Sequence, residues 1–199
     1  MKQLNELLSD IKKDYQSLLE EMKLSEKRKL HIEGCIELAY SLAKVYAIDV
    51  NKAVLVALLH DFFREVDNKG IIEKAQSLNI EISDFELSYP KVLHGKVAAS
   101  YFSAKGLIKD KDILEAISHH TLGSSNVCSL TKLLFIVDAL EKHREYEGVE
   151  ELRKIIEGKS LDNAYIIVLK RTIIDMINKN KVLAPSTIGA YNYMMEDNL

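Results

Sequence analysis

Helical periodicity is the feature of this sequence that most restricts its fold. Apolar residues recur three and four positions apart, as between Leu4 and Met22, and this spacing lines one face of an α-helix. No segment shows the sustained alternation of apolar and polar residues that is typical of a half-buried strand. Eight glycines and two prolines in 199 residues also provide few turn residues for a sandwich or a barrel. The sequence therefore predicts a single all-α domain.

The spacing also predicts where the helices lie. Asp49 is expected to cap the third helix, because a carboxylate accepts hydrogen bonds from the free N–H groups of a first turn. That helix is apolar on nearly every side from Ala53 to Leu59, which is typical of a helix at the centre of a bundle. Residues 83–88 and the segment around Pro185 are expected to be irregular. The predicted helices cover residues 4–22, 29–46, 51–63, 71–78, 90–106, 111–121, 129–143, 149–157 and 164–178.

Charge and composition exclude several classes of partner. The net charge is -3 and the basic residues are scattered, so the basic surface of a nucleic-acid-binding protein is missing. Apolar runs such as 54–59 and 133–137 are far shorter than the roughly 20 residues of a membrane span. The N-terminal residues lack the apolar stretch of a signal peptide, and Cys35 and Cys128 form no disulfide framework. We expect a cytoplasmic protein without nucleic-acid or membrane partners.

A His-Asp pair at the end of the most apolar helix suggests a metal site. Burying the ionised carboxylate of Asp61 is costly without a positive partner, and a divalent cation bound by His60 and Asp61 would be one. His31, early in the second helix, and Asp138, inside the apolar run LLFIVDAL, are further candidate ligands. Each of them alone has an ordinary explanation as a satisfied core histidine or a hydrogen-bond hub.

The remaining histidines extend this pattern. His94 lies between the His-Asp pair and a second pair, His119 and His120, of which His119 is expected to be the outer member. A surface position near a helix end would explain the second pair alone, because the helix dipole favours imidazolium there. The ordered series His, His-Asp, His, His-His, Asp on different predicted helices favours a site over unrelated core residues.

In this order the sequence resembles the HD-domain metal-dependent phosphohydrolases, which are helical bundles with the pattern His, His-Asp and a distant Asp. It is similar in particular to the YqeK-like family of symmetrical dinucleoside tetraphosphate hydrolases, over residues 28–192. Ile32, Lys142, His143, Ala184 and Tyr191 depart from that family's usual residues, which affects fine substrate contacts more than metal binding. The matching segments are LLHDFFRE with Arg64 in its basic position, His94, HTLG at 120–123, VDALEKHR with Asp138, Glu141 and Arg144, GVEELR at 148–153 and PST at 185–187.

The resemblance implies a domain organisation and a metal site. Residues 28–199 would form the HD domain with its C-terminal helices, and residues 1–27 an amphipathic helix that packs on the bundle or at a homodimer contact. A divalent metal would be held by four residues, with iron favoured over manganese, cobalt or zinc, and a second metal is left open. The implied metal ligands are His31, His60, Asp61 and Asp138.

The activity implied by the resemblance is the hydrolysis of diadenosine tetraphosphate into two ADP by a metal-activated water. Asp61 and Asp138 are candidates for accepting a proton, while His94 and His120 would bind a second metal or contact phosphate. The alternatives are another (deoxy)nucleotide or signalling nucleotide as the substrate, a non-catalytic nucleotide-sensing module, or a bundle with incidental histidines. The implied substrate contacts are His31, Asp61, Phe62, Phe63, Arg64, His94, His120, Thr121, Asp138, Arg144, Lys181, Val182, Leu183, Ala184, Pro185 and Ser186.

Overall fold

The computed structural model describes residues 2–196, so residue 1 and residues 197–199 of the predicted domains lie outside it. Across the described residues the chain forms helices and no strand, which confirms the all-α prediction. None of these helices combines the length and the apolarity needed to cross a membrane. The elements are α1 (Lys2–Asp14), α2 (Gln16–Glu21), α3 (Glu26–Val45), α4 (Val50–Leu59), α5 (Asn68–Ser77), α6 (Asp84–Ser88), the 3-10 helix η1 (Pro90–Leu93), α7 (His94–Ala104), α8 (Lys111–His119), α9 (Ser129–Leu140), α10 (Val149–Ile156), α11 (Leu161–Asn178) and α12 (Pro185–Glu196).

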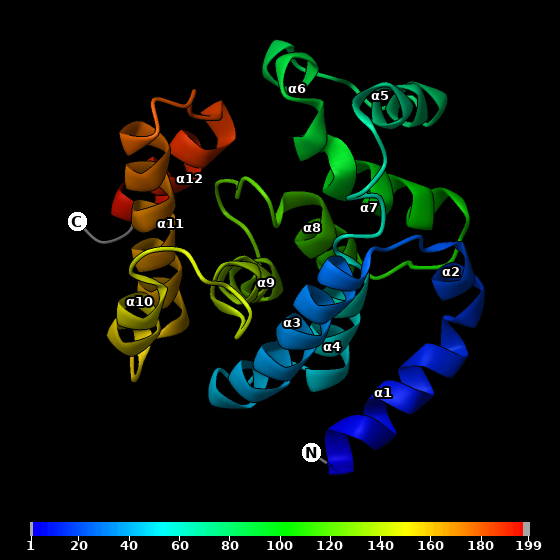
Figure 1. The fold of residues 1–199 in the computed structure, drawn as a ribbon, viewed down its shortest axis with the longest axis horizontal. Coiled ribbons are helices and arrows are strands. Elements are labelled where there is room, and N and C mark those ends of the chain that lie inside the picture. Colours follow the sequence, from blue (N-terminus) through cyan, green and yellow to red (C-terminus); the bar gives the residue numbers. More distant parts are fainter. Residues whose placement is uncertain (1, 197–199) are drawn as a thin grey trace.

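Helix α9 occupies the centre of the bundle. It contacts α3, α4 and α8 on one side and α10 and α11 on the other, and Figure 1 shows it nearly end-on between these two groups. Leu133 and Val137 pack into the first group, whereas Phe135 and Ile136 pack into the second. Because α9 serves two hydrophobic clusters, it is apolar around most of its circumference.

Helix α4 is the other helix that is apolar around most of its circumference. All of its residues from Ala53 to Leu59 are buried, as the sequence predicts. The side chain of Asp49 accepts a hydrogen bond from the Lys52 N–H at 3.1 Å, which confirms the predicted cap. The helix ends at Leu59, however, and not at Phe63 as the sequence analysis expected. His60 to Arg64 therefore lie in turns.

The N-terminal region forms two helices where one was predicted. Tyr15 has φ −112° and ψ 22°, which lies outside the α-helical region and separates α1 from α2. Leu4, Ile11 and Leu18 are buried in the same cluster as α3 and α4. The amphipathic face of this region therefore packs on the bundle.

Other boundaries also differ from the prediction. Residues 84–88 form α6, because Ser83 and Glu86 make a reciprocal capping box. A 3-10 turn, η1, precedes α7 in the range 90–106. Helix α9 ends at Leu140, before the predicted residue 143. Pro185 begins a helix, α12, where a loop was expected, since a proline needs no N–H partner in a first turn.

Candidate metal centre

Three helices bring the predicted ligands together. His31 lies on α3, His60 and Asp61 directly follow α4, and Asp138 lies on α9. Because α3 and α4 both contact α9, their side chains meet where the three helices converge. His31, His60 and Asp61 are buried, and a quarter of the Asp138 side chain is exposed.

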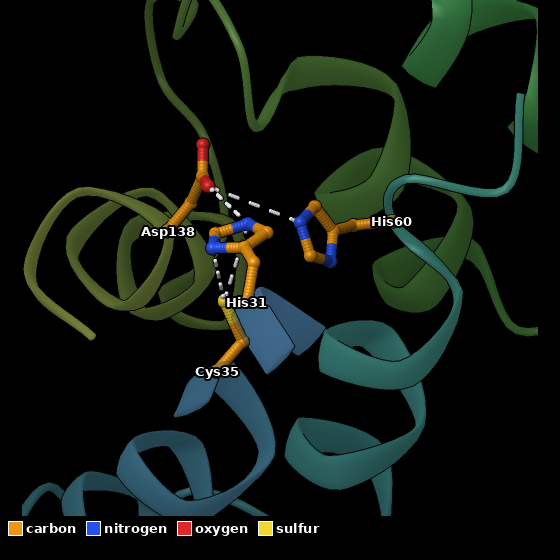
Figure 2. Close-up of side chains that lie close together, drawn as sticks. All are labelled: His31, Cys35, His60 and Asp138. Atoms are coloured by element: carbon orange, nitrogen blue, oxygen red, sulfur yellow. Dashed lines mark hydrogen bonds and ion pairs between the residues drawn. The ribbon is translucent and has the colours of Figure 1, made fainter. Parts of the chain in front are cut away.

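The donor atoms of these residues are close enough to share one ion. His31 Nε2 lies 3.0 Å from Asp138 Oδ1 and 3.7 Å from Asp61 Oδ2. His60 Nε2 lies 3.4 Å from Asp61 Oδ2 and 3.9 Å from Asp138 Oδ1. Figure 2 shows His31, His60 and Asp138 facing one another. Ligand atoms bound to a common first-row ion are typically about 3–4 Å apart, so the spacing fits a divalent metal.

The four buried histidines share one hydrogen-bonding arrangement. In each ring Nδ1 faces a carbonyl or carboxylate oxygen, which can only accept, so Nδ1 is assigned as the donor. A neutral ring then presents the lone pair of Nε2 to the site. The Nδ1 partners are Glu141 Oε1 for His31 (3.0 Å), the Ala57 carbonyl for His60 (2.9 Å), the Lys91 carbonyl for His94 (2.7 Å) and the Ile117 carbonyl for His120 (2.8 Å).

These lone pairs face other acceptors. His60 Nε2 is buried without a hydrogen-bond partner among the described residues. His94 Nε2 and His120 Nε2 are 3.0 Å apart, although each ring already donates through Nδ1. Buried acceptors that face one another need a proton or a cation between them. The donor set therefore fits a bound divalent cation.

Asp61 joins two groups of donor atoms. Its Oδ2 faces His31 and His60, whereas its Oδ1 lies 3.0 Å from His94 Nε2 and 3.8 Å from His120 Nε2. One ligand atom each from His60, Asp61 and His120 also lies within 4.8 Å of the others. The structure thus brings His94 and His120 to the same centre as the four predicted ligands.

The protonation states of the two carboxylates and of His120 suit metal binding. Burial opposes ionisation of Asp61, but His60 and His94 hold the pKa of its carboxyl well below the usual range. Burial likewise opposes ionisation of Asp138, and His31 and Arg144 lower its pKa. Burial lowers the pKa of His120 to about 3, so this ring is neutral at physiological pH. Ionised carboxylates and a neutral imidazole are the forms that coordinate a metal. Burial opposes ionisation of His31, but its hydrogen bonds to Asp138 and Glu141 raise its pKa, so a metal would compete with a proton for this ring.

Arginines contact both ligand carboxylates. Arg28 Nη1 lies 2.5 Å from Asp61 Oδ2, and Arg144 Nη2 lies 2.6 Å from Asp138 Oδ1. The Arg64 side chain has no hydrogen-bond or ion-pair partner among the described residues. The sequence analysis missed Arg28, although its position one helical turn before His31 places both on one face of α3.

The predicted nucleotide contacts fall into two groups. The side chains of Phe62 and Phe63 are buried in the hydrophobic core, and Phe62 packs edge-to-face on Phe102 with ring centroids 5.1 Å apart. Thr121, by contrast, reaches the site, with Oγ1 3.1 Å from His120 Nε2. Ligand contacts from Phe62 and Phe63 would therefore come from the backbone.

The predicted 181–186 segment leads into α12. Lys181, Val182, Pro185 and Ser186 are exposed, Leu183 is half-buried and Ala184 is buried. The next residue, Thr187, donates a hydrogen bond from Oγ1 to the Leu122 carbonyl at 2.7 Å. This bond connects the start of α12 to the loop that carries His120 and Thr121.

Cys35 also lies beside the centre. Its sulfur is 3.6 Å from His31 Nε2 and 3.8 Å from Nδ1, and these nearly equal distances place it off the lone-pair axis of Nε2. Burial raises the pKa of the Cys35 thiol well above its ordinary value, which keeps it protonated. Figure 2 shows it next to His31 on the same helix. Cys35 therefore behaves as a packed apolar residue.

The fold and the centre define a helical protein with a His, His-Asp, Asp donor set. A family model described as HD domain matches residues 28–170, which is well over half of the chain. The chain belongs to the HD-domain family, as its sequence pattern predicts.

Curated relatives and a solved structure are similar over most of this chain. Proteins named symmetrical bis(5'-nucleosyl)-tetraphosphatase from Halalkalibacterium halodurans and Staphylococcus aureus are 33% and 34% identical to it. The matches cover 86% of this chain and 91% and 88% of those proteins. A crystal structure from Clostridium acetobutylicum, described as a predicted HD superfamily hydrolase involved in NAD metabolism, has a TM-score of 0.85 and 32% identity. It covers 92% of this chain and 97% of its own, which confirms the predicted HD-domain bundle.

Proposed function

We propose that the protein is a metal-dependent phosphohydrolase that cleaves diadenosine tetraphosphate symmetrically into two ADP. The observation that carries the metal chemistry is the convergence of the four donor residues, whose atoms lie 3.0 to 3.9 Å apart. The names of the similar proteins support the substrate and the symmetrical cut. With a nucleotide substrate and two free cysteines, the cytoplasm is the compartment we propose.

His31, His60, Asp61 and Asp138 would hold the metal, for which we propose iron, with manganese, cobalt or zinc as substitutes. When bound, such an ion makes a water more acidic and polarises a phosphoryl oxygen. In the hydrolysis, a water oxygen bonds to one of the two central phosphorus atoms. The bond from that phosphorus to the shared bridging oxygen breaks, and ADP leaves with that oxygen.

The residues of the chain supply proton transfer and charge. Asp61 and Asp138 are ionised, so either can accept the proton of the attacking water. His94 and His120 face Oδ1 of Asp61, the oxygen that points away from His31 and His60. There they would contact a phosphate oxygen or hold a second metal.

The anionic substrate also needs cationic partners. Arg28 and Arg144 already contact the ligand carboxylates, and the Arg64 side chain makes no ion pair with the described residues. A guanidinium grips two phosphate oxygens at once. We propose that these arginines offset the charge of the four phosphates, with Thr121 and the 181–186 segment on the nucleotide.

The test is product analysis after incubation of the metal-loaded protein with diadenosine tetraphosphate. ADP as the sole nucleotide product is expected. The pair AMP and ATP would contradict the symmetrical cut, and no turnover with iron, manganese or cobalt would contradict the substrate.

A second candidate is hydrolysis of another nucleotide at the same centre. Ala184 and Tyr191 stand where the resembling family usually has His and Arg, and these positions belong to or follow the segment proposed to contact the nucleotide. A panel of nucleoside phosphates ranked by kcat/KM separates the candidates. The first proposal requires diadenosine tetraphosphate to rank highest.

A further inference from the structure

We propose that Glu141 is a positioning residue of the metal centre and that Gly34 provides the space it occupies. Glu141 would hold the His31 ring with Nε2 directed into the site. This inference rests on the proposed metal site but not on the identity of the nucleotide.

His31 differs from the other buried histidines in where it lies. His60, His94 and His120 stand at helix ends, and each Nδ1 bonds the carbonyl three residues earlier, where helical hydrogen bonding is incomplete. His31 lies inside the 20-residue helix α3, whose interior carbonyls are already occupied. Its Nδ1 therefore needs an acceptor from outside the helix.

Glu141 supplies that acceptor. Its side chain is 1% exposed, with Oε1 3.0 Å from His31 Nδ1, and Oε2 accepts a hydrogen bond from the His143 N–H at 2.6 Å. The carboxylate lies behind the ring, on the side opposite Nε2, so it is not itself a ligand. Outer carboxylates of this kind fix the tautomer of a ligand histidine and increase its basicity.

The backbone of Glu141 is also held in place. Arg153 donates from Nε to the Leu140 carbonyl at 2.9 Å, and its Nη2 donates to the Glu141 carbonyl. The Arg144 N–H donates to the same Glu141 carbonyl at 3.0 Å. The point from which the Glu141 side chain enters the bundle is therefore fixed at the end of α9.

Gly34 explains how the carboxylate fits against α3. A Cβ atom at this position would overlap Glu141 Oε2, and it would lie 3.0 Å from Glu141 Cδ and 3.2 Å from the His143 ring. Glycine in a helix interior is unfavourable relative to alanine. Its presence one turn after His31 is accounted for by the close approach of Glu141.

The experiment measures Mn²⁺ binding to the full chain without nucleotide, by equilibrium dialysis and calorimetry. Glu141→Gln and Glu141→Ala are each expected to raise the Mn²⁺ Kd by about 10- to 100-fold. Glutamine conserves the side-chain volume, but its amide has a single acceptor oxygen and cannot accept hydrogen bonds from both His31 and His143.

Gly34→Ala should raise the Mn²⁺ Kd similarly, because its methyl group displaces the Glu141 carboxylate. Glu37→Gln is the matched control, since half-buried Glu37 pairs with Lys142 beside Glu141 and should leave the Kd unchanged.

The double variant Gly34→Ala/Glu141→Ala provides the decisive comparison. If Gly34 acts through Glu141, its Kd should equal that of Glu141→Ala rather than the product of the two single effects. Each variant with a raised Kd should also show an altered absorption spectrum when loaded with Co²⁺. A general loss of stability would leave the spectrum of the loaded protein unchanged. Wild-type affinity in Glu141→Gln, or multiplicative effects in the double variant, would overturn the inference. A wild-type chain that binds no Mn²⁺ would overturn the metal site as well.

Discussion

At the scale of single residues, Asp61 is the carboxylate that contacts the most ionisable groups of the site. One buried carboxylate lies within 3.8 Å of the Nε2 atoms of four histidines, and Arg28 contacts its Oδ2. The same oxygen faces two of the proposed metal ligands. Arg28 and a metal cation would therefore compete for Asp61 Oδ2. Loss of Arg28 should for this reason affect metal binding differently from loss of a metal ligand.

Arg28→Ala is expected to lower activity without weakening metal binding. Loss of one charged hydrogen bond typically costs about 1.5–3 kcal/mol, so kcat/KM for the tetraphosphate should fall roughly 10- to 100-fold. The Mn²⁺ Kd should stay constant or decrease, because Asp61 loses a competing cation. Steady-state kinetics and metal titration of the same preparation check both effects. A weaker metal affinity would show that Arg28 instead supports the ligand geometry.

The residue scale also shows what the sequence could predict. The resemblance of the His31, His60-Asp61 and Asp138 series to the HD-domain pattern predicts the proposed ligands, and the structure brings these residues together. Arg28 and the acceptor role of Glu141 were not predicted. Both depend on which atoms meet when α3 packs against the turn after α4 and the end of α9, and sequence spacing alone does not determine that contact.

At the scale of helices, α9 is the element on which both hydrophobic clusters depend. Its Leu133 is fully buried, and Leu→Ala substitutions at such sites cost about 2–5 kcal/mol through lost contacts and the cavity left behind. We expect Leu133→Ala to lower the free energy of unfolding by this amount in urea titration. Ile174→Ala on α11, where the side chain is 52% exposed, is the control and should change stability by less than about 0.5 kcal/mol.

Helix α6 provides a pH-dependent contribution. Burial opposes ionisation of Glu86, but hydrogen bonds from Ser83 and the nearby Lys96 lower the pKa of its carboxyl below the ordinary value. A lowered pKa in the folded state stabilises the protein above the unfolded pKa, about 4.3, and the contribution disappears as the pH falls through the folded value.

The wild type should therefore be more stable than Glu86→Gln at pH 7, and the difference should decrease below about pH 4. Denaturant titrations of both proteins from pH 3 to pH 8 test this. A difference that is independent of pH would mean that the Glu86 charge does not contribute.

Element boundaries were predicted less well than the elements themselves, for identifiable reasons. The Ser83-x-x-Glu86 spacing is a capping-box signal, and Pro185 suits a first turn, so α6 and α12 were accessible from local chemistry. The break at Tyr15 has no such signal. It depends on how α1 and α2 pack against the rest of the bundle.

At the scale of the whole molecule, the proposed metal connects α3, the turn after α4 and α9. A ligand that binds only the folded chain stabilises it by RT ln(1 + [L]/Kd), about 2.7 kcal/mol at 100 times the Kd. For a chain of this length we expect Tm to rise by roughly 5–10 °C on metal addition. Chelation should reverse the shift, and His60→Ala should not show it. An equal shift in His60→Ala would place the stabilising ion elsewhere.

The central claim is that this centre binds a metal and uses it to cut diadenosine tetraphosphate in the middle. The most direct measurement combines metal content with nucleotide products for the wild type and for Asp61→Asn, which conserves side-chain volume. We predict that the loaded wild type converts each substrate molecule into two ADP, and that Asp61→Asn has lost both bound metal and turnover. AMP and ATP as products, or undiminished turnover in metal-free Asp61→Asn, would contradict the account.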